Sequence, residues 1–136
     1  MEYEDITDKI IGCCYKVYNV LGYGFLESVY EKALLIELNR SGLDAKAQKE
    51  ILVHYDGEIV GEFRADILVE DVVIVELKSV KMLAKAHEVQ LVNYLAATQK
   101  DVGLLVNFGE RSVQVKRKVR DINYYKNNLV NPVNPV

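Results

Sequence analysis

The sequence predicts an α/β fold with a mixed β-sheet of about five strands flanked by helices. Three observations lead to this prediction. Two segments with helical periodicity precede every strand pattern, the β-branched run at 72–75 is typical of a buried central strand, and a helical segment separates that run from another apolar strand. The chain has 136 residues, of which 50% are hydrophobic and 27% charged, which suits one domain with one sizeable core.

The first two predicted elements are helices. Apolar residues recur every three or four positions in the first segment, which predicts a helix over 5–21 with one buried face. Gly22 and Gly24 interrupt this pattern, and a second helical pattern follows over 26–38. Gly42 is placed to terminate that second helix.

Three strands are predicted next. Apolar residues alternate over 51–55 and lead into Asp56-Gly57, a dipeptide typical of a tight hairpin turn, after which a strand covers 58–69. Glu70-Asp71 separates this strand from the run at 72–75, which we expect in the middle of the sheet.

The last predicted elements complete the sheet. A helix over 84–99 and an apolar strand over 102–108 form a βαβ unit with the strand that precedes them. An alternating pattern over 112–119 predicts an antiparallel edge strand. We therefore expect a single domain over 1–125, followed by a short C-terminal tail over 126–136.

Charge and composition exclude several classes of protein. Seventeen Lys and Arg against twenty Asp and Glu give a formal net charge of -3, which argues against coating of nucleic acid by bulk charge. The sequence contains no apolar stretch of about 18 residues and begins with an acidic segment, so we expect a cytoplasmic protein without membrane contact. Cys13 and Cys14 are adjacent, where a disulfide would be strained, so we expect reduced thiols near the core.

Charged residues interrupt the apolar strands where the central strand ends. The run at 72–75 is followed by Glu76, Leu77 and Lys78, and strand alternation places Glu76 and Lys78 on one face. Asp66 interrupts the preceding strand. Two carboxylates can hold Mg²⁺, which prefers oxygen ligands, and an adjacent lysine can stabilise charge that develops on a phosphate. The pattern suits phosphodiester hydrolysis, although spacing alone equally allows a structural Glu76–Lys78 ion pair.

A shared metal requires that Asp66 and Glu76 point to the same face. A two-residue turn at Glu70-Asp71 would place Asp66 opposite Val75, with its carboxylate facing away from Glu76. We therefore predict a three-residue turn, a bulge or a sharp bend near Asp66.

Two further pairs of residues strengthen the functional interpretation. Glu27 lies in the first turn of the second predicted helix, with Tyr30 one turn later. Gln90 and Tyr94 are four residues apart, on one face of the third predicted helix. Alone, the first pair suits helix capping and the second suits an ordinary helix surface.

Together these residues resemble the PD-(D/E)xK nuclease superfamily, and specifically its small GxxExxY family, whose name describes Gly24, Glu27 and Tyr30. The resemblance covers about 6–120. It rests on the segments 21–30 and 61–78, the Gln-x-x-x-Tyr element of the third helix, and the strand end at 105–109. Ala65 replaces the proline that usually precedes the first Asp, at a position where the superfamily varies.

The resemblance implies a restriction-endonuclease-like core with a site for Mg²⁺, for which Mn²⁺ can substitute. Asp66 and Glu76 would be metal ligands, the Leu77 carbonyl a third, and Glu27 would join directly or through water. Lys78 would be the catalytic lysine. The residues expected to bind nucleic acid or to support the site are Gln90, Tyr94, Tyr30 and Arg64.

The implied function is a metal-dependent nuclease that hydrolyses phosphodiester bonds in nucleic acid, with DNA favoured over RNA. The alternative is a catalytically silent binding module, because fold alone does not determine the reaction. Basic residues over 78–85 and 111–120 can follow a phosphate backbone, although the second group equally suits a charged edge strand. A homodimer or a protein partner would help so small and acidic a domain to hold a long polyanion.

Overall fold

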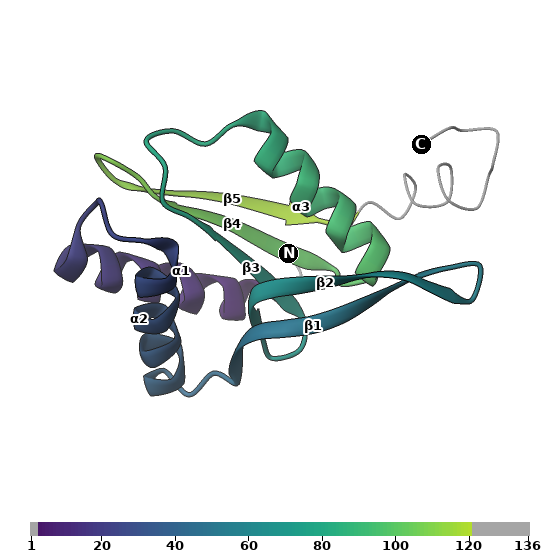
Figure 1. The fold of residues 1–136 in the computed structure, drawn as a ribbon. Helices are drawn as coiled ribbons and strands as arrows, with labels where there is room; N and C mark the ends of the chain where they lie inside the picture. The colour runs from purple at the N-terminus through teal and green to yellow at the C-terminus, as the bar shows by residue number, and fades with distance from the viewer. Residues whose placement is uncertain (1–2, 121–136) are drawn as a thin grey trace.

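A computed structural model describes residues 3–120 of the chain (Figure 1). The α/β class and the predicted order of elements are confirmed. The elements are α1 (Glu4–Leu21), α2 (Glu27–Arg40), β1 (Ala45–Tyr55), β2 (Glu58–Val69), β3 (Val73–Lys78), α3 (Lys85–Thr98), β4 (Val102–Phe108) and β5 (Val113–Val119).

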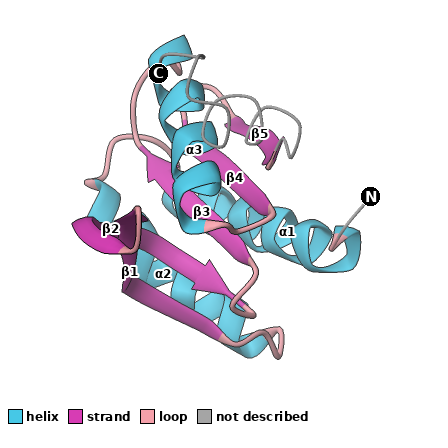
Figure 2. Ribbon diagram, turned by 90° about the vertical axis from the view of Figure 1, so that its right-hand side faces the viewer, coloured by secondary structure: helices cyan, strands magenta, loops and turns pink. Residues whose placement is uncertain are grey.

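The strands form one mixed sheet in the order β1-β2-β3-β4-β5, so β3 lies at its centre as predicted. Strands β3 and β4 are parallel, joined through α3, and the other neighbouring pairs are antiparallel. Helices α1 and α2 cover one face of the sheet, and α3 covers the other (Figures 1 and 2).

Each face of the sheet has its own hydrophobic cluster. Val73, Val75 and Leu77 of β3 belong to the cluster beneath α1 and α2, whereas Ile74 belongs to the cluster beneath α3. Because strand side chains alternate, Glu76 and Lys78 share the α3 side with Ile74. The end of the central strand therefore presents its two charged groups on one face, as the sequence predicts.

The register between β2 and β3 is the one that places Asp66 and Glu76 on the same face. Val69 pairs with Val73 and Ile67 with Val75, which leaves three residues in the turn. Continuing this register by one pair places Asp66 opposite Glu76. The predicted three-residue turn is therefore confirmed.

Strand β1 differs from the prediction because it begins at Ala45 rather than at 51. Its first half is rich in exposed polar residues, including Lys46, Lys49 and Glu50, so it lacks the alternation that marks a half-buried strand. Pairing with β2 holds this segment in the sheet. Tertiary pairing thus outweighs local sequence preference here.

The remaining expectations concern thiols, membranes and the tail. Cys13 and Cys14 are free and buried in α1, and burial raises the pKa of Cys14 to about 12, so its thiol stays protonated at neutral pH. Among residues 3–120, no helix is long and apolar enough to cross a membrane. The predicted tail over 126–136 lies outside the described residues.

Candidate active site

Asp66 and Glu76 meet where the pairing of β2 with β3 ends. The Asp66 backbone N–H donates to Glu76 Oε1 at 3.4 Å, and the Leu77 N–H donates to Asp66 Oδ2 at 2.8 Å. The Asp66 carboxylate thus accepts a hydrogen bond from the β3 backbone just beyond the last paired residues of the two strands, Ile67 and Val75. This arrangement brings two carboxyl groups together at the end of the central strand.

The carboxyl of Glu76 is strongly perturbed by its surroundings. Its pKa is raised to about 8, first by burial and then by the nearby charges of Asp66 and Glu27, against the lowering effects of the Asp66 N–H and the Lys78 ammonium. All four groups predicted to be catalytic therefore interact electrostatically. In the absence of a cation, Glu76 is largely protonated at neutral pH.

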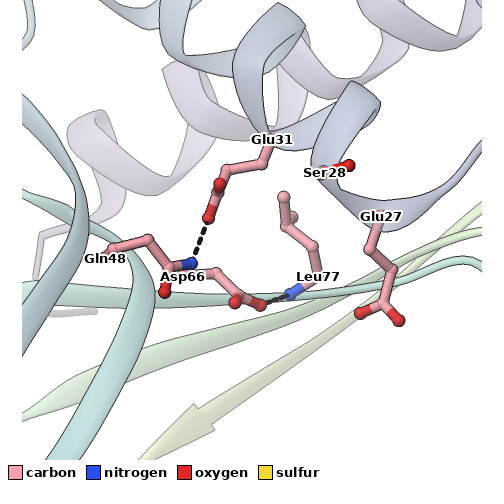
Figure 3. A pocket seen from close by; sticks show the side chains of 6 residues that line it. All are labelled: Glu27, Ser28, Glu31, Gln48, Asp66 and Leu77. Atoms are coloured by element: carbon pink, nitrogen blue, oxygen red, sulfur yellow. Dashed lines mark hydrogen bonds between the residues drawn. The ribbon is translucent and has the colours of Figure 1, made fainter.

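A pocket of about 130 Å³ opens beside Asp66, between α2 and the sheet (Figure 3), and neither Glu76 nor Lys78 lines it. Three of its lining residues are acidic, and none is basic. The lining residues are Glu27, Ser28, Glu31, Gln48, Asp66 and Leu77. A concave site with several oxygen donors has the donor chemistry that a hard divalent cation needs.

The structure brings together only some of the residues predicted to bind metal. Within residues 3–120, no three His, Cys, Asp or Glu side chains are grouped closely enough to hold a metal ion. Asp66 and Glu76 are adjacent, whereas Glu27 is exposed at the start of α2 and shares only the pocket with Asp66. Any metal bound here would therefore rely on water or backbone oxygens beyond two carboxylates.

Tyr30 supports the site from inside the core. Its ring is completely buried and stacks on Phe108 with a centroid separation of 4.3 Å. Its hydroxyl donates to the Gly22 carbonyl and accepts from the Phe25 N–H. Tyr30 thus fixes the turn that leads to Glu27, and its burial excludes the alternative role of direct nucleic-acid contact.

The Gln-x-x-x-Tyr element lies on α3, above β2. Gln90 is exposed, and its amide donates to the Tyr94 hydroxyl at 3.4 Å. The Tyr94 ring stacks on Phe63 of β2 at 3.8 Å. These contacts hold α3 against β2, while Gln90 remains accessible to a ligand.

Arg64 holds the β1–β2 pair together. Its guanidinium lies 3.5 Å from Glu50 and 3.6 Å from Glu62, and it donates to the Gln48 carbonyl at 3.4 Å. Because two acids already engage this charge, the contacts favour support of the strands over recognition of phosphate.

Two pocket residues, Gln48 and Glu31, are absent from the sequence-based prediction. The Gln48 amide donates to Glu31 Oε1 at 2.6 Å, as Figure 3 shows. Glu31 lies one turn after Glu27, so helical spacing could have identified it. Gln48 lies in a polar stretch without periodicity, and nothing in the sequence alone singles it out.

Asn107 is a third residue whose role emerges only in three dimensions. It pairs in register with Lys78 and is completely buried. Its side chain accepts from the Val80 N–H at 2.9 Å and donates to the Val80 carbonyl at 2.8 Å and to Gln114 at 2.9 Å. Asn107 therefore holds the backbone that follows Lys78.

A second bond links this loop to the start of α2. The Ser79 hydroxyl donates to the Phe25 carbonyl at 2.8 Å. The loop after Lys78 and the segment before Glu27 are thus held together, although they are far apart in the sequence.

Comparison with solved structures supports the fold. The chain resembles the crystal structure of SSO0001 with a TM-score of 0.54 and 17% sequence identity. The match covers 76% of this chain and 57% of that one, so this chain spans little more than half of the solved structure. At this identity, the likeness concerns the fold alone.

Comparison of sequences identifies the family. No curated protein matches the chain. A family model described as the PD-(D/E)XK nuclease superfamily matches residues 4–119, which include every strand and helix of the structure. The chain therefore belongs to the PD-(D/E)XK nuclease superfamily.

Proposed function

We propose that this chain is a metal-dependent nuclease of the GxxExxY type that hydrolyses phosphodiester bonds in nucleic acid, with DNA as the favoured substrate. The observation that carries the proposal is the meeting of Asp66 and Glu76 at the end of β3, on the strand that also bears Lys78. Superfamily membership gives the general chemistry, and these three residues supply the groups that it requires.

Asp66 and Glu76 would hold Mg²⁺ or Mn²⁺, with the Leu77 carbonyl and Glu27, directly or through water, as further ligands. When bound, the cation supplies a polarised phosphoryl oxygen and a more acidic water. Lys78 follows Glu76 by two residues and shares its face, so its ammonium can orient that water and stabilise charge on the phosphate.

The chain's own residues prepare this site in two ways. Burial holds the Glu76 carboxyl largely protonated until a cation offsets the charges of its neighbours, so metal binding would release a proton. The bonds from Asn107 to Val80 and from Ser79 to Phe25 hold the loop beyond Lys78 and limit its movement.

A catalytically silent binding module is the second candidate. Among the described residues, acidic side chains do not form a ready three-ligand cluster, and this observation favours the alternative. The two candidates differ in one measurable property, because only the enzyme would depend on Lys78 for cleavage of nucleic acid.

The test compares the purified chain with Lys78→Ala on single- and double-stranded DNA and RNA, with Mg²⁺, Mn²⁺ or excess chelator. We expect metal-dependent cleavage that falls by at least about a hundredfold in Lys78→Ala, the usual scale for loss of a transition-state contact. Lys9→Ala, on the exposed surface of α1, is the matched control and should cleave like the wild type.

Three results discriminate between the candidates. Equal cleavage by the wild type and Lys78→Ala would identify a contaminating nuclease and overturn the proposal. Binding of nucleic acid without cleavage under any metal condition would establish the binding module. A magnesium-induced rise in Tm that survives in Lys78→Ala would support the assignment of Lys78 to chemistry rather than to metal binding.

A further inference from the structure

Gln48 has an unusual backbone conformation for a residue inside a β-strand. Its φ is 53°, in the left-handed region that side chains other than glycine rarely adopt. Pairing with β2 continues on both sides of it, through Ala47 with Ile67 and Lys49 with Ala65. Gln48 therefore stands opposite Asp66 at an interruption of the ladder, which keeps the same register on both sides of it.

At this position, the side chains of both strands change the face of the sheet to which they point. In β1, Ala45 packs in the cluster beneath α1 and α2, whereas Ile51 packs against the cluster beneath α3. In β2, Ile67 belongs to the first cluster and Ala65 to the second. Odd-numbered residues of a regular strand would all share one face, so the pair exchanges its faces between these positions.

Asp66 lies at this exchange of faces, and its carboxylate points to neither cluster. It accepts the Leu77 N–H at 2.8 Å instead, beside Glu76. A regular strand at this position would direct the side chain perpendicular to the sheet, away from the β3 backbone. The turnover of the strands therefore accounts for the orientation of the carboxylate.

Both the carbonyl and the side chain of Gln48 are held in place. Its carbonyl accepts from Arg64 at 3.4 Å, and its amide donates to Glu31 of α2 at 2.6 Å. Figure 3 shows Gln48, Glu31 and Asp66 around the same pocket. Strained backbone held by its surroundings beside a candidate site is a known mark of functional geometry.

We propose that Gln48 is a positioning residue for Asp66. Its left-handed backbone, held by the bond from Arg64 to its carbonyl, turns the strand pair so that the Asp66 carboxylate reaches the end of β3. The expectation that Gln48 affects metal binding rests on the proposed function. The expectation that Gln48 sets the orientation of the Asp66 carboxylate does not.

The test observes the Leu77 amide by NMR, because this N–H donates to Asp66. Gln48→Gly accepts a left-handed backbone, Gln48→Val strongly disfavours it, and Asp66→Ala gives the reference for a lost bond. We expect Gln48→Gly to keep the Leu77 amide shift of the wild type and Gln48→Val to move it towards that of Asp66→Ala. Lys49→Val, an exposed neighbour in the same strand, is the control and should leave it unchanged.

If Gln48→Val does not fold, Gln48→Thr replaces it, since its β-branched side chain also disfavours the left-handed region and is polar. A wild-type Leu77 shift in the folded Val or Thr variant would overturn the proposal. Equal displacement in the Gly variant and in the Val or Thr variant would also overturn it, because the side chain rather than the backbone would then control Asp66.

Magnesium affinity gives the second measurement. We expect Gln48→Val to bind Mg²⁺ about tenfold or more weakly, as when a partner of a metal ligand is lost, and Gln48→Gly to remain within about threefold of the wild type. If the wild type binds no metal, the proposed function fails, but the Leu77 amide still decides the role of Gln48.

Discussion

Two neighbouring strands end in polar side chains, one completely buried and one half-buried, whose surroundings differ sharply. Asn107, near the end of β4, is completely buried and satisfied by Val80 and Gln114. Glu76, near the end of β3, receives one long hydrogen bond from Asp66 and faces the repelling charges of Asp66 and Glu27. In the free protein, the surroundings of Asn107 satisfy its amide, whereas the surroundings of Glu76 disfavour a charged carboxylate.

This difference separates a residue that supports the fold from one that supports chemistry. A buried amide with its hydrogen bonds complete lowers the free energy of the folded chain and requires nothing more. A half-buried carboxyl with acidic neighbours raises that free energy until a cation binds. Replacing Asn107 by an apolar residue should therefore lower stability, whereas replacing Glu76 by a neutral residue should raise it at neutral pH.

The largest expected effect on stability is at Asn107. Asn107→Leu keeps a similar volume but leaves the Val80 N–H and carbonyl without their partner, so unfolding should become easier by about 2–4 kcal/mol. Urea unfolding measures this change. Asn93→Leu, on the exposed face of α3, is the control and should shift stability by less than about 0.5 kcal/mol. A similarly small change at Asn107 would contradict its structural role.

The next effect is the pH dependence that Glu76 imposes on the metal-free protein. Its pKa rises from an ordinary 4.5 to about 8 on folding, so the folded state retains a proton that the unfolded state releases between these values. This contribution to stability is fully present below pH 4.5 and is lost as the pH rises to about 8.

Glu76→Gln removes this titration, so the difference in stability between variant and wild type should grow by about 1–3 kcal/mol from pH 4.5 to 8. Unfolding curves in chelator across this range provide the measurement. A difference that stays constant with pH would show that Glu76 ionises normally.

The smallest expected effect is at Asp66. Asp66→Asn removes one charge beside Glu76 and keeps an oxygen that can accept the Leu77 N–H, so the metal-free protein should gain about 1 kcal/mol. Magnesium should raise the Tm of the wild type and hardly affect the variant. Asp8→Asn, exposed on α1, serves as the charge-matched control. Strong destabilisation by Asp66→Asn, with no magnesium shift in either protein, would make Asp66 a structural residue.

Sequence patterns predicted the parts of this molecule that depend on local periodicity and turn chemistry. Strands β2 and β4 have the predicted bounds, because apolar residues and turn signals mark both of their ends. The contact between Asp66 and Glu76 was also foreseen, because two ligands of one metal require a particular register.

The features that escaped prediction depend on contacts between distant segments. The first half of β1 is polar and exposed, so only its pairing with β2 makes it a strand. The left-handed backbone at Gln48 has no local signal, since glycine or asparagine is the usual mark of that conformation. Asn107 lies in the segment 105–109 that carries part of the family resemblance, but its hydrogen bonds to Val80 depend on the folded loop.

The exchange of faces in the β1–β2 pair divides this hairpin into regions of different cooperativity. Beyond the Leu52–Glu62 pair the arm is mostly exposed, whereas the base from Ile67 to Val69 is buried in the cores. Exposed strand pairs open by local fluctuations, and buried ones open only with the whole domain. Amide protons of the arm should thus exchange with solvent well before those of the base. Asp66 adjoins the slowly opening base, so the site can stay assembled while the arm beside it frays.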